Sequence, residues 1–232
     1  MIENAGIRLG GSNSSISNNI IYSNGGAGIV LAGNGTSGNT ISQNSIFANG
    51  TAGDALGIDL GGPGGADPMG DGVSYNDSGD TDNGPNGLIN FPVLAGAYIQ
   101  GTELIVKGWA RPGDLVEVFF SDIQEGTATI GDNQLGNNYD YGEGQTFIGS
   151  ATEGSGSDLD GATASYADLD GNTDTTNRFE FRFPLPAGTD IGDLLTGTAT
   201  GAGSTSEFSP MIEIRVPTLI TNRRITYRVN PN

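Results

Sequence analysis

The sequence predicts an all-β protein in which a short solenoid of stacked coils is followed by a β-sandwich. Two short patterns recur in the same order within the first 60 residues, and strand-like runs separated by turn residues fill the chain after residue 87. Glycine makes up 40 of the 232 residues, well above the usual share of about 7%. Repeats with constant interiors and variable gaps are typical of solenoids, because their strands stack in a shared core while their turns absorb insertions.

The first pattern is a glycine followed by alternating aliphatic residues. It reads Gly-Ile-Arg-Leu-Gly-Gly at residues 6–11, Gly-Ile-Val-Leu-Ala-Gly at 28–33 and Gly-Ile-Asp-Leu-Gly-Gly at 57–62. Apolar residues that alternate over three or four positions between glycines indicate short strands rather than helices. We therefore expect the Ile and Leu side chains of each copy to point into the core.

The second pattern predicts two further strands and a turn in each coil. It reads Ile-Ser-Asn-Asn-Ile-Ile-Tyr-Ser-Asn-Gly at 16–25 and Ile-Ser-Gln-Asn-Ser-Ile-Phe-Ala-Asn-Gly at 41–50. Asn24 and Asn49 follow strands, where asparagine tolerates the left-handed conformation. Equivalent asparagines of successive coils are expected to stack in a hydrogen-bonded ladder. Ordinary turns of an unrelated β-meander are the alternative, which the repeated order of two patterns disfavours.

These residues resemble the right-handed parallel β-helix repeat family, in which Gly-Ile-x-Leu and Asn-x-Ile-x-x-Asn-Gly mark successive rungs. The resemblance covers residues 1–60. It implies a fold rather than an activity, since lyases, hydrolases, tailspikes and non-catalytic surface proteins share it. This segment holds about two and a half coils, fewer than the roughly three that usually bury a continuous core. Because Met1 falls in the middle of a repeat, we expect a fragment of a longer protein.

The chain after the repeats divides into three parts. Residues 61–87 are rich in Gly, Pro, Asp and Asn, which predicts a linker or a long ordered loop. Residues 88–216 are predicted to form an immunoglobulin-like β-sandwich of about seven strands. Residues 217–232 would be a C-terminal strand or linker. The runs expected to form strands are 88–98, 103–110, 115–121, 145–151, 178–183, 194–200 and 207–216.

Several strings resemble a junction in large bacterial surface and secreted proteins, where a β-helix ends and an immunoglobulin-like domain begins. The resemblance implies an extracellular or cell-surface location and a non-catalytic module. We interpret the chain as a structural or adhesive part of a larger protein, and a surface glycan or a protein would be its ligand. The strings that carry the resemblance lie at residues 57–63, 80–94, 141–149, 197–200 and 204–209.

Charge and composition exclude several classes of function. A net charge of −18 argues against binding to nucleic acid or to anionic membranes, and the absence of a long apolar run argues against membrane insertion. The chain has no Cys and no His, which excludes thiol nucleophiles and Ser-His-Asp triads. Acyl transfer would therefore have to rely on Lys107, the single lysine. A polysaccharide lyase or glycoside hydrolase that uses carboxylates on its coils remains the alternative.

Calcium is the cofactor that this composition favours. Asp168, Asp170, Asn172 and Asp174 place oxygen ligands at every second position, as calcium-binding loops do. The segment departs from the EF-hand pattern, since Thr173 stands where that pattern has glycine.

Two further acidic clusters could hold Ca²⁺, although solvated acidic turns are the alternative for every cluster. The first consists of Asp77, Asp80 and Asp82, and the second of Asp158 and Asp160.

The C-terminal segment 223–229, Arg-Arg-Ile-Thr-Tyr-Arg-Val, alternates polar and apolar residues like a strand with one basic face. It could close the sandwich, begin a further domain, or pair with an edge of a neighbouring subunit. In the last case the protein would form a homo-oligomer or a filament, with the basic tail meeting an acidic body.

Overall fold

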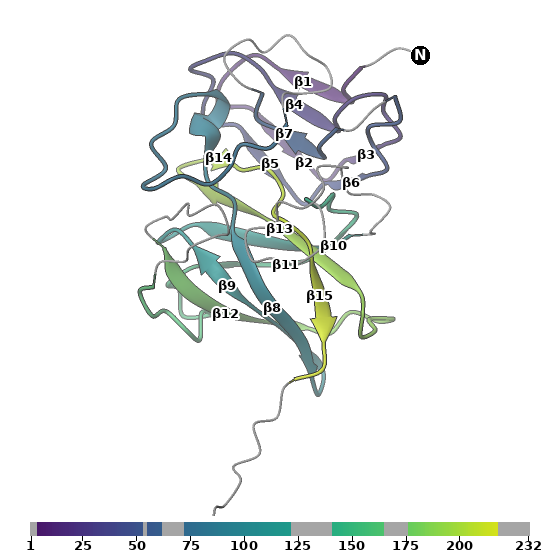
Figure 1. Ribbon diagram of the computed structural model, residues 1–232, viewed down its shortest axis with the longest axis vertical. Helices are drawn as coiled ribbons and strands as arrows, with labels where there is room; N and C mark the ends of the chain where they lie inside the picture. Colours follow the sequence, from purple (N-terminus) through teal and green to yellow (C-terminus); the bar gives the residue numbers. More distant parts are fainter. Residues whose placement is uncertain (1–3, 53–54, 62–71, 122–140, 165–175, 218–232) are drawn as a thin grey trace, which may run out of the picture.

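The computed structural model describes residues 4–52, 55–61, 72–121, 141–164 and 176–217. Every regular element in these ranges is a β-strand except one 3₁₀ turn, η1 (Pro85–Leu88), which confirms the predicted all-β class. The coils lie at one end of the molecule and a curved sheet at the other, with the short strand β14 (Ser204–Thr205) beside the coils (Figure 1).

The coils consist of parallel strands stacked in three ladders. The ladders are β1 (Ile7–Leu9), β4 (Ile29–Leu31) and β7 (Ile58–Asp59); β2 (Ser15–Ser17) and β5 (Thr40–Ser42); and β3 (Ile20–Tyr22) and β6 (Ser45–Phe47). The register pairs the same position of each repeat, so that Ile7 lies beside Ile29 and Ile29 beside Ile58. As predicted, the aliphatic residues point inward, and Ile29 and Leu31 are fully buried.

An asparagine ladder joins the coils, as expected. The Asn19 amide group donates to Asn44 Oδ1 at 3.0 Å, and that of Asn24 donates to Asn49 Oδ1 at 2.8 Å. The same acceptors also take the main-chain N–H of the asparagine one coil earlier, at 2.9 and 3.3 Å.

The prediction was wrong about which corner residue adopts the left-handed conformation. It is the residue before each ladder asparagine, at Asn18, Ser23, Gln43 and Ala48, with φ between 52° and 59°. The bend falls one position earlier because the ladder asparagine must direct its side chain along the stack.

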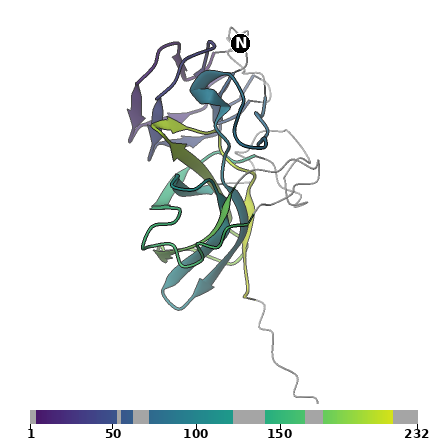
Figure 2. The ribbon, with the colours of Figure 1, turned by 90° about the vertical axis from the view of Figure 1, so that its left-hand side faces the viewer.

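The second unit is one curved sheet with the strand order β11-β10-β13-β15-β8-β9-β12, and β14 pairs with β13. Strand β15 pairs antiparallel with β13 and parallel with β8, so it joins two groups of strands into a nearly closed sheet (Figure 2). The bounds are β8 (Val93–Gln100), β9 (Glu103–Ala110), β10 (Leu115–Ser121), β11 (Thr146–Thr152), β12 (Asn177–Pro184), β13 (Leu194–Gly201) and β15 (Ile212–Arg215).

The core of this sheet contains three phenylalanines that alternate with charged residues along β12. Phe179, Phe181 and Phe183 are at most 6% exposed and share one cluster with Val116 and Val118 of the opposite group of strands. The rings of Phe179 and Phe181 are stacked, with centroids 4.3 Å apart. The period of two along a strand thus places the three rings on the buried face of β12.

Two predicted strands are shorter than expected. The run 88–98 forms a strand only from Val93, and the run 207–216 only from Ile212. The residues before Val93 bond to the loop 72–87 instead, as Asn90 does to Asp77 and Asp80. Before Ile212, Glu207 accepts the N–H of Leu60 in the coils.

The described part of the glycine-rich region, residues 72–87, is an ordered loop. Asn76 makes two hydrogen bonds to the main chain of Phe91, at 2.8 and 2.9 Å, and Asn90 Oδ1 accepts the N–H of Asp77 at 3.0 Å. Buried asparagines thus replace strand pairing as the support of this loop.

Candidate functional site

The candidate site is the surface where the curved sheet covers the last coil. Ile46 and Leu60 of the coils share one apolar cluster with Ile89, Phe119 and Phe208 of the second unit. The Phe119 and Phe208 rings meet edge to face, with centroids 5.5 Å apart. The cluster continues the core of the coils without a break, so the end of the solenoid is closed by aromatic side chains.

Glu143 extends the asparagine ladder at one corner of the last coil. Its Oε2 accepts the N–H of Asn49 at 3.2 Å, and its Oε1 accepts the Asn49 side-chain amide at 2.9 Å. Asn49 Oδ1 accepts the same two groups from Asn24 one coil earlier. The Glu143 carboxylate, which is 1% exposed, therefore stands where the asparagine of a further coil would stand.

Glu117 serves a second corner, after β5. Its two oxygens accept the Ser42 hydroxyl at 2.8 Å and the Gln43 N–H at 3.1 Å. The residue is 1% exposed and lies in the middle of β10. Burial raises the pKa of Glu117, while the hydrogen bonds from Ser42 and Gln43 act in the opposite direction.

Glu207 serves the third corner, after β7. Its oxygens accept the N–H groups of Leu60 and Ser74, both at 2.8 Å. Asp59, which is fully buried, lies beside it. Burial, followed by the Asp59 carboxylate, raises the pKa of Glu207 well above its ordinary value.

Asn86 and Thr205 complete the cover over β5. Asn86 Oδ1 accepts the Asn39 N–H at 3.1 Å, and its amide donates to the carbonyls of Asn39 and Thr205 at 2.8 and 3.0 Å. The Thr205 hydroxyl accepts the Ile41 N–H at 2.9 Å. One coil earlier, Asn39 Oδ1 accepts the N–H of Ser14, so Asn86 occupies the next place in that series.

Main-chain groups of the second unit bond to β6 as well. The Ile46 N–H donates to the Gly144 carbonyl at 2.8 Å, and the Ser45 hydroxyl donates to the Gln145 carbonyl at 2.6 Å. The second unit thus reproduces both the side-chain and the main-chain hydrogen bonds of a stacked coil.

Sequence reasoning missed the three glutamates. A signal existed for Glu117, because Val116 and Val118 flank it in a buried strand and a carboxylate in such a place needs hydrogen-bond donors. Glu143 and Glu207 lie in glycine- and serine-containing loops, where an acidic residue is unremarkable in sequence.

In the structure, the predicted metal ligands Asp77 and Asp80 of the first acidic cluster bond to protein groups, including Arg111, which lies 3.8 Å from Asp80. Asp77 accepts the N–H and hydroxyl of Thr81, and Asp80 accepts the Asn90 N–H at 2.9 Å. Asp82 is exposed. No group of three or more acidic side chains in the described ranges is arranged to hold a metal ion, so calcium binding stays a prediction.

The remaining predicted sites divide between turns and residues that the structure does not describe. Asp158 Oδ1 accepts the N–H groups of Asp160 and Glu180 at 3.0 and 3.1 Å, as a turn-forming aspartate does. The predicted ligands Asp168, Asp170, Asn172 and Asp174, and the tail 223–229, lie outside the described residues.

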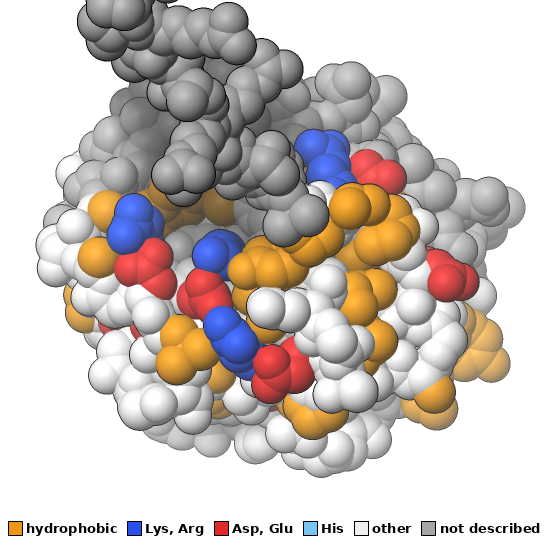
Figure 3. All heavy atoms as spheres, turned by 90° about the horizontal axis from the view of Figure 1, so that it is seen from below, with side chains coloured by type: hydrophobic (Ala, Val, Ile, Leu, Met, Phe, Trp, Pro, Cys, Tyr) orange, Lys and Arg blue, Asp and Glu red, His pale blue; other side chains and the backbone are white. Residues whose placement is uncertain are grey.

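Charged side chains of opposite sign lie next to one another on the end of the sheet away from the coils (Figure 3). On β9 and β12, Glu180 bonds to Lys107 at 2.7 Å and to Arg182 at 2.9 Å. The hydrogen bond from Lys107 lowers the pKa of Glu180, and the same bond raises that of Lys107. These pairs are partly exposed and contribute little to stability.

The stacked parallel ladders place the first part of the chain in the class of β-solenoids. Residues 1–62 match the family model described as "Right handed beta helix region", and this segment is a right-handed β-helix region. A search of the curated proteins found no match to the chain. Within the described residues, no helix is long and apolar enough to cross a membrane.

Proposed function

We propose that the second unit is the cap of the right-handed β-helix and that the chain is a non-catalytic structural or adhesive module. One observation carries the proposal. Buried carboxylates from the second unit accept N–H groups at three corners of the coils, and Asn86 supplies a fourth contact.

A β-helix needs such a cap for a physical reason. The last coil of an uncapped solenoid would present a row of main-chain donors and acceptors together with the open end of its apolar core. Such an edge pairs readily with other chains. The observed contacts satisfy these groups and cover the core, as terminal repeats do in other solenoids.

We further propose that the cap is an immunoglobulin-like sandwich. The strand order supports this, with β8, β9 and β12 in one group and β11, β10, β13 and β15 in the other. The parallel pairing of β15 with β8 supports it as well, since an immunoglobulin-like sandwich likewise brings its last strand beside its first.

The resemblance noted in the sequence supports a secreted or cell-surface bacterial protein as the setting of this module. A carbohydrate-active enzyme is the weaker alternative. The charged side chains of the described coils are Arg8 and Asp59, and Asp59 is buried beneath the cap. A carboxylate in that position would not reach a polysaccharide on the outer face of the coils.

Replacing Asn86 with glycine tests the capping role. Asn86→Gly keeps the left-handed main chain (φ 51°) and removes only the hydrogen bonds to Asn39 and Thr205. We expect faster amide hydrogen exchange at Asn39 and Ile41, which belong to the coils.

Asn18→Gly is the matched control, because Asn18 has φ 59° and an exposed side chain. Equal exchange at Asn39 and Ile41 in the two variants would overturn the capping role.

A further inference from the structure

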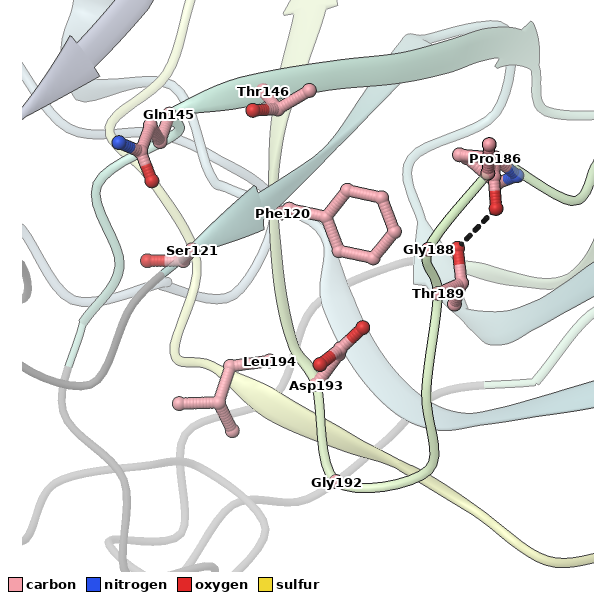
Figure 4. Close-up of a pocket in the computed structure, with 11 residues that line it drawn as sticks. Phe120, Ser121, Gln145, Thr146, Pro186, Gly188, Thr189, Gly192, Asp193 and Leu194 are labelled. Atoms are coloured by element: carbon pink, nitrogen blue, oxygen red, sulfur yellow. Dashed lines mark hydrogen bonds between the residues drawn. The ribbon is translucent and has the colours of Figure 1, made fainter.

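A pocket of about 540 Å³ opens on the flank of the cap (Figure 4). Phe120 and Ser121 line it from the end of β10, Gln145 and Thr146 from the start of β11, and the loop 186–193 closes its other side. Its volume lies within the range of about 300–1,000 Å³ that is usual for small-molecule sites. Three strand ends position the lining, so the site is built on the scaffold of the cap.

The pocket combines one aromatic ring with polar side chains. The Phe120 ring projects toward the loop that carries Thr189, and the Asp193 carboxylate points toward the same space (Figure 4). Asp193 Oδ2 accepts the Asp190 N–H at 2.8 Å, whereas Oδ1 takes no hydrogen bond from a described residue. Because the Thr189 hydroxyl donates to the Pro186 carbonyl at 2.8 Å, its oxygen can still accept a further hydrogen bond.

Two more polar side chains lie at the mouth of the pocket. Neither the Gln145 side-chain amide nor the Thr146 hydroxyl hydrogen-bonds to a described residue, and Thr146 is exposed. An amide and a hydroxyl both donate and accept, so together they match a ligand that bears hydroxyl groups.

The charge of the lining selects among ligand classes. The described lining contains no Lys or Arg, so an anionic ligand would find no counter-charge. A purely apolar ligand would leave the Asp193 carboxylate and the Gln145 amide desolvated without partners. We propose that the pocket binds a neutral saccharide unit, with one apolar face of the sugar against Phe120 and its hydroxyls bonded to Asp193, Gln145 and Thr146. This inference is independent of the capping role.

The test titrates the whole protein with neutral disaccharides (cellobiose, maltose, lactose and N,N′-diacetylchitobiose) while the main-chain amides are followed by NMR. An organic cation, tetramethylammonium, and an anionic sugar, digalacturonate, serve as contrasting probes. At least one neutral disaccharide is expected to shift the amides of Phe120, Thr146 and Asp193. If none does so at tens of millimolar, or if only the cation or the anion does, the proposal is wrong.

Variants locate the binding. Thr146→Val keeps the shape of an exposed side chain and removes its hydroxyl, and Phe120→Ala removes the ring. We expect about tenfold weaker binding of the disaccharide for Phe120→Ala. Thr146→Val should also weaken binding, and it tests the proposal if Phe120→Ala fails to fold, because an exposed threonine can be replaced without disturbing the core.

Tyr22→Ala is the control, because Tyr22 is a 56% exposed aromatic residue that stacks on Phe47 of the coils. Loss of binding in Tyr22→Ala with full binding in Thr146→Val would place the ligand on the coils and overturn the proposal.

Discussion

Replacement of Glu143 by alanine should destabilise the whole molecule through a single corner of the coil. The side chain is 1% exposed, and its two oxygens accept two groups of Asn49. Hydrogen bonds to a charged group contribute about 1.5–3 kcal/mol each. Alanine leaves both donors of the half-buried Asn49 without this acceptor, so we expect a loss of about 3 kcal/mol, the lower end for two such bonds. For a chain of this size that corresponds to a fall in Tm of about 6–12 °C.

The assay is thermal and urea unfolding followed by circular dichroism, together with amide hydrogen exchange at Asn49. Glu143→Gln should show about half the effect, because the amide keeps one acceptor and turns a donor toward the Asn49 side chain. Glu103→Ala is the control, since Glu103 is about half exposed and lies 3.5 Å from Arg182. The reasoning is refuted if Glu143→Ala is as stable as Glu103→Ala, or if exchange at Asn49 is unchanged.

Three further predictions follow from the structure. The pKa of Glu207 is raised above the ordinary 4.5. Its contribution to the free energy of unfolding is therefore complete below that pH and is lost as the pH rises through the folded-state pKa. Glu207→Gln should flatten the decline with pH of the free energy of unfolding, measured by urea titration above about pH 4.5. Asn49→Ala removes the ladder bonds on both sides and should lower the free energy of unfolding by about 3 kcal/mol in urea titrations. Gly108→Ala would place a methyl group against the Val93 carbonyl and 2.7 Å from the Phe179 ring. This crowding should lower the free energy of unfolding by about 3 kcal/mol and lower Tm accordingly. In the control Gly10→Ala the methyl group meets open space, so Tm should be nearly unchanged.

Calcium binding and self-association can be tested on the same protein. If the acidic loops bind Ca²⁺, millimolar Ca²⁺ should raise Tm relative to excess chelator, because a ligand that binds only the native state stabilises it. An unchanged Tm would count against the prediction. If the segment 223–229 joins subunits, its deletion should reduce the oligomeric state measured by sedimentation.

The ladder residues show why the coils could be predicted. Ile29, Leu31 and Asn49 make their contacts with equivalent residues about one repeat away, so each partner carries the same local pattern. The alternating phenylalanines of β12 were predictable for a related reason, since a period of two assigns a face without knowledge of the partner strand. The strand bounds near residues 90 and 210 were not, because there the chain bonds to the loop 72–87 and to the coils, whose positions only the tertiary structure gives.

The sequence by itself determined that the chain is all β, that its first part is a stack of parallel coils, and which aliphatic side chains of the repeats point into their core. Those properties follow from short-range periodicity, which each segment carries on its own. Only the tertiary structure decided what closes the coils. Glu117, Glu143 and Glu207 meet corners that lie 74 to 147 residues away, and no local pattern marks them as partners. Their burial is tolerable only because each carboxylate receives two hydrogen bonds once the units meet. Both donors come from the coil for Glu117 and Glu143, whereas Glu207 takes one from Leu60 of the coil and one from Ser74 of the following loop.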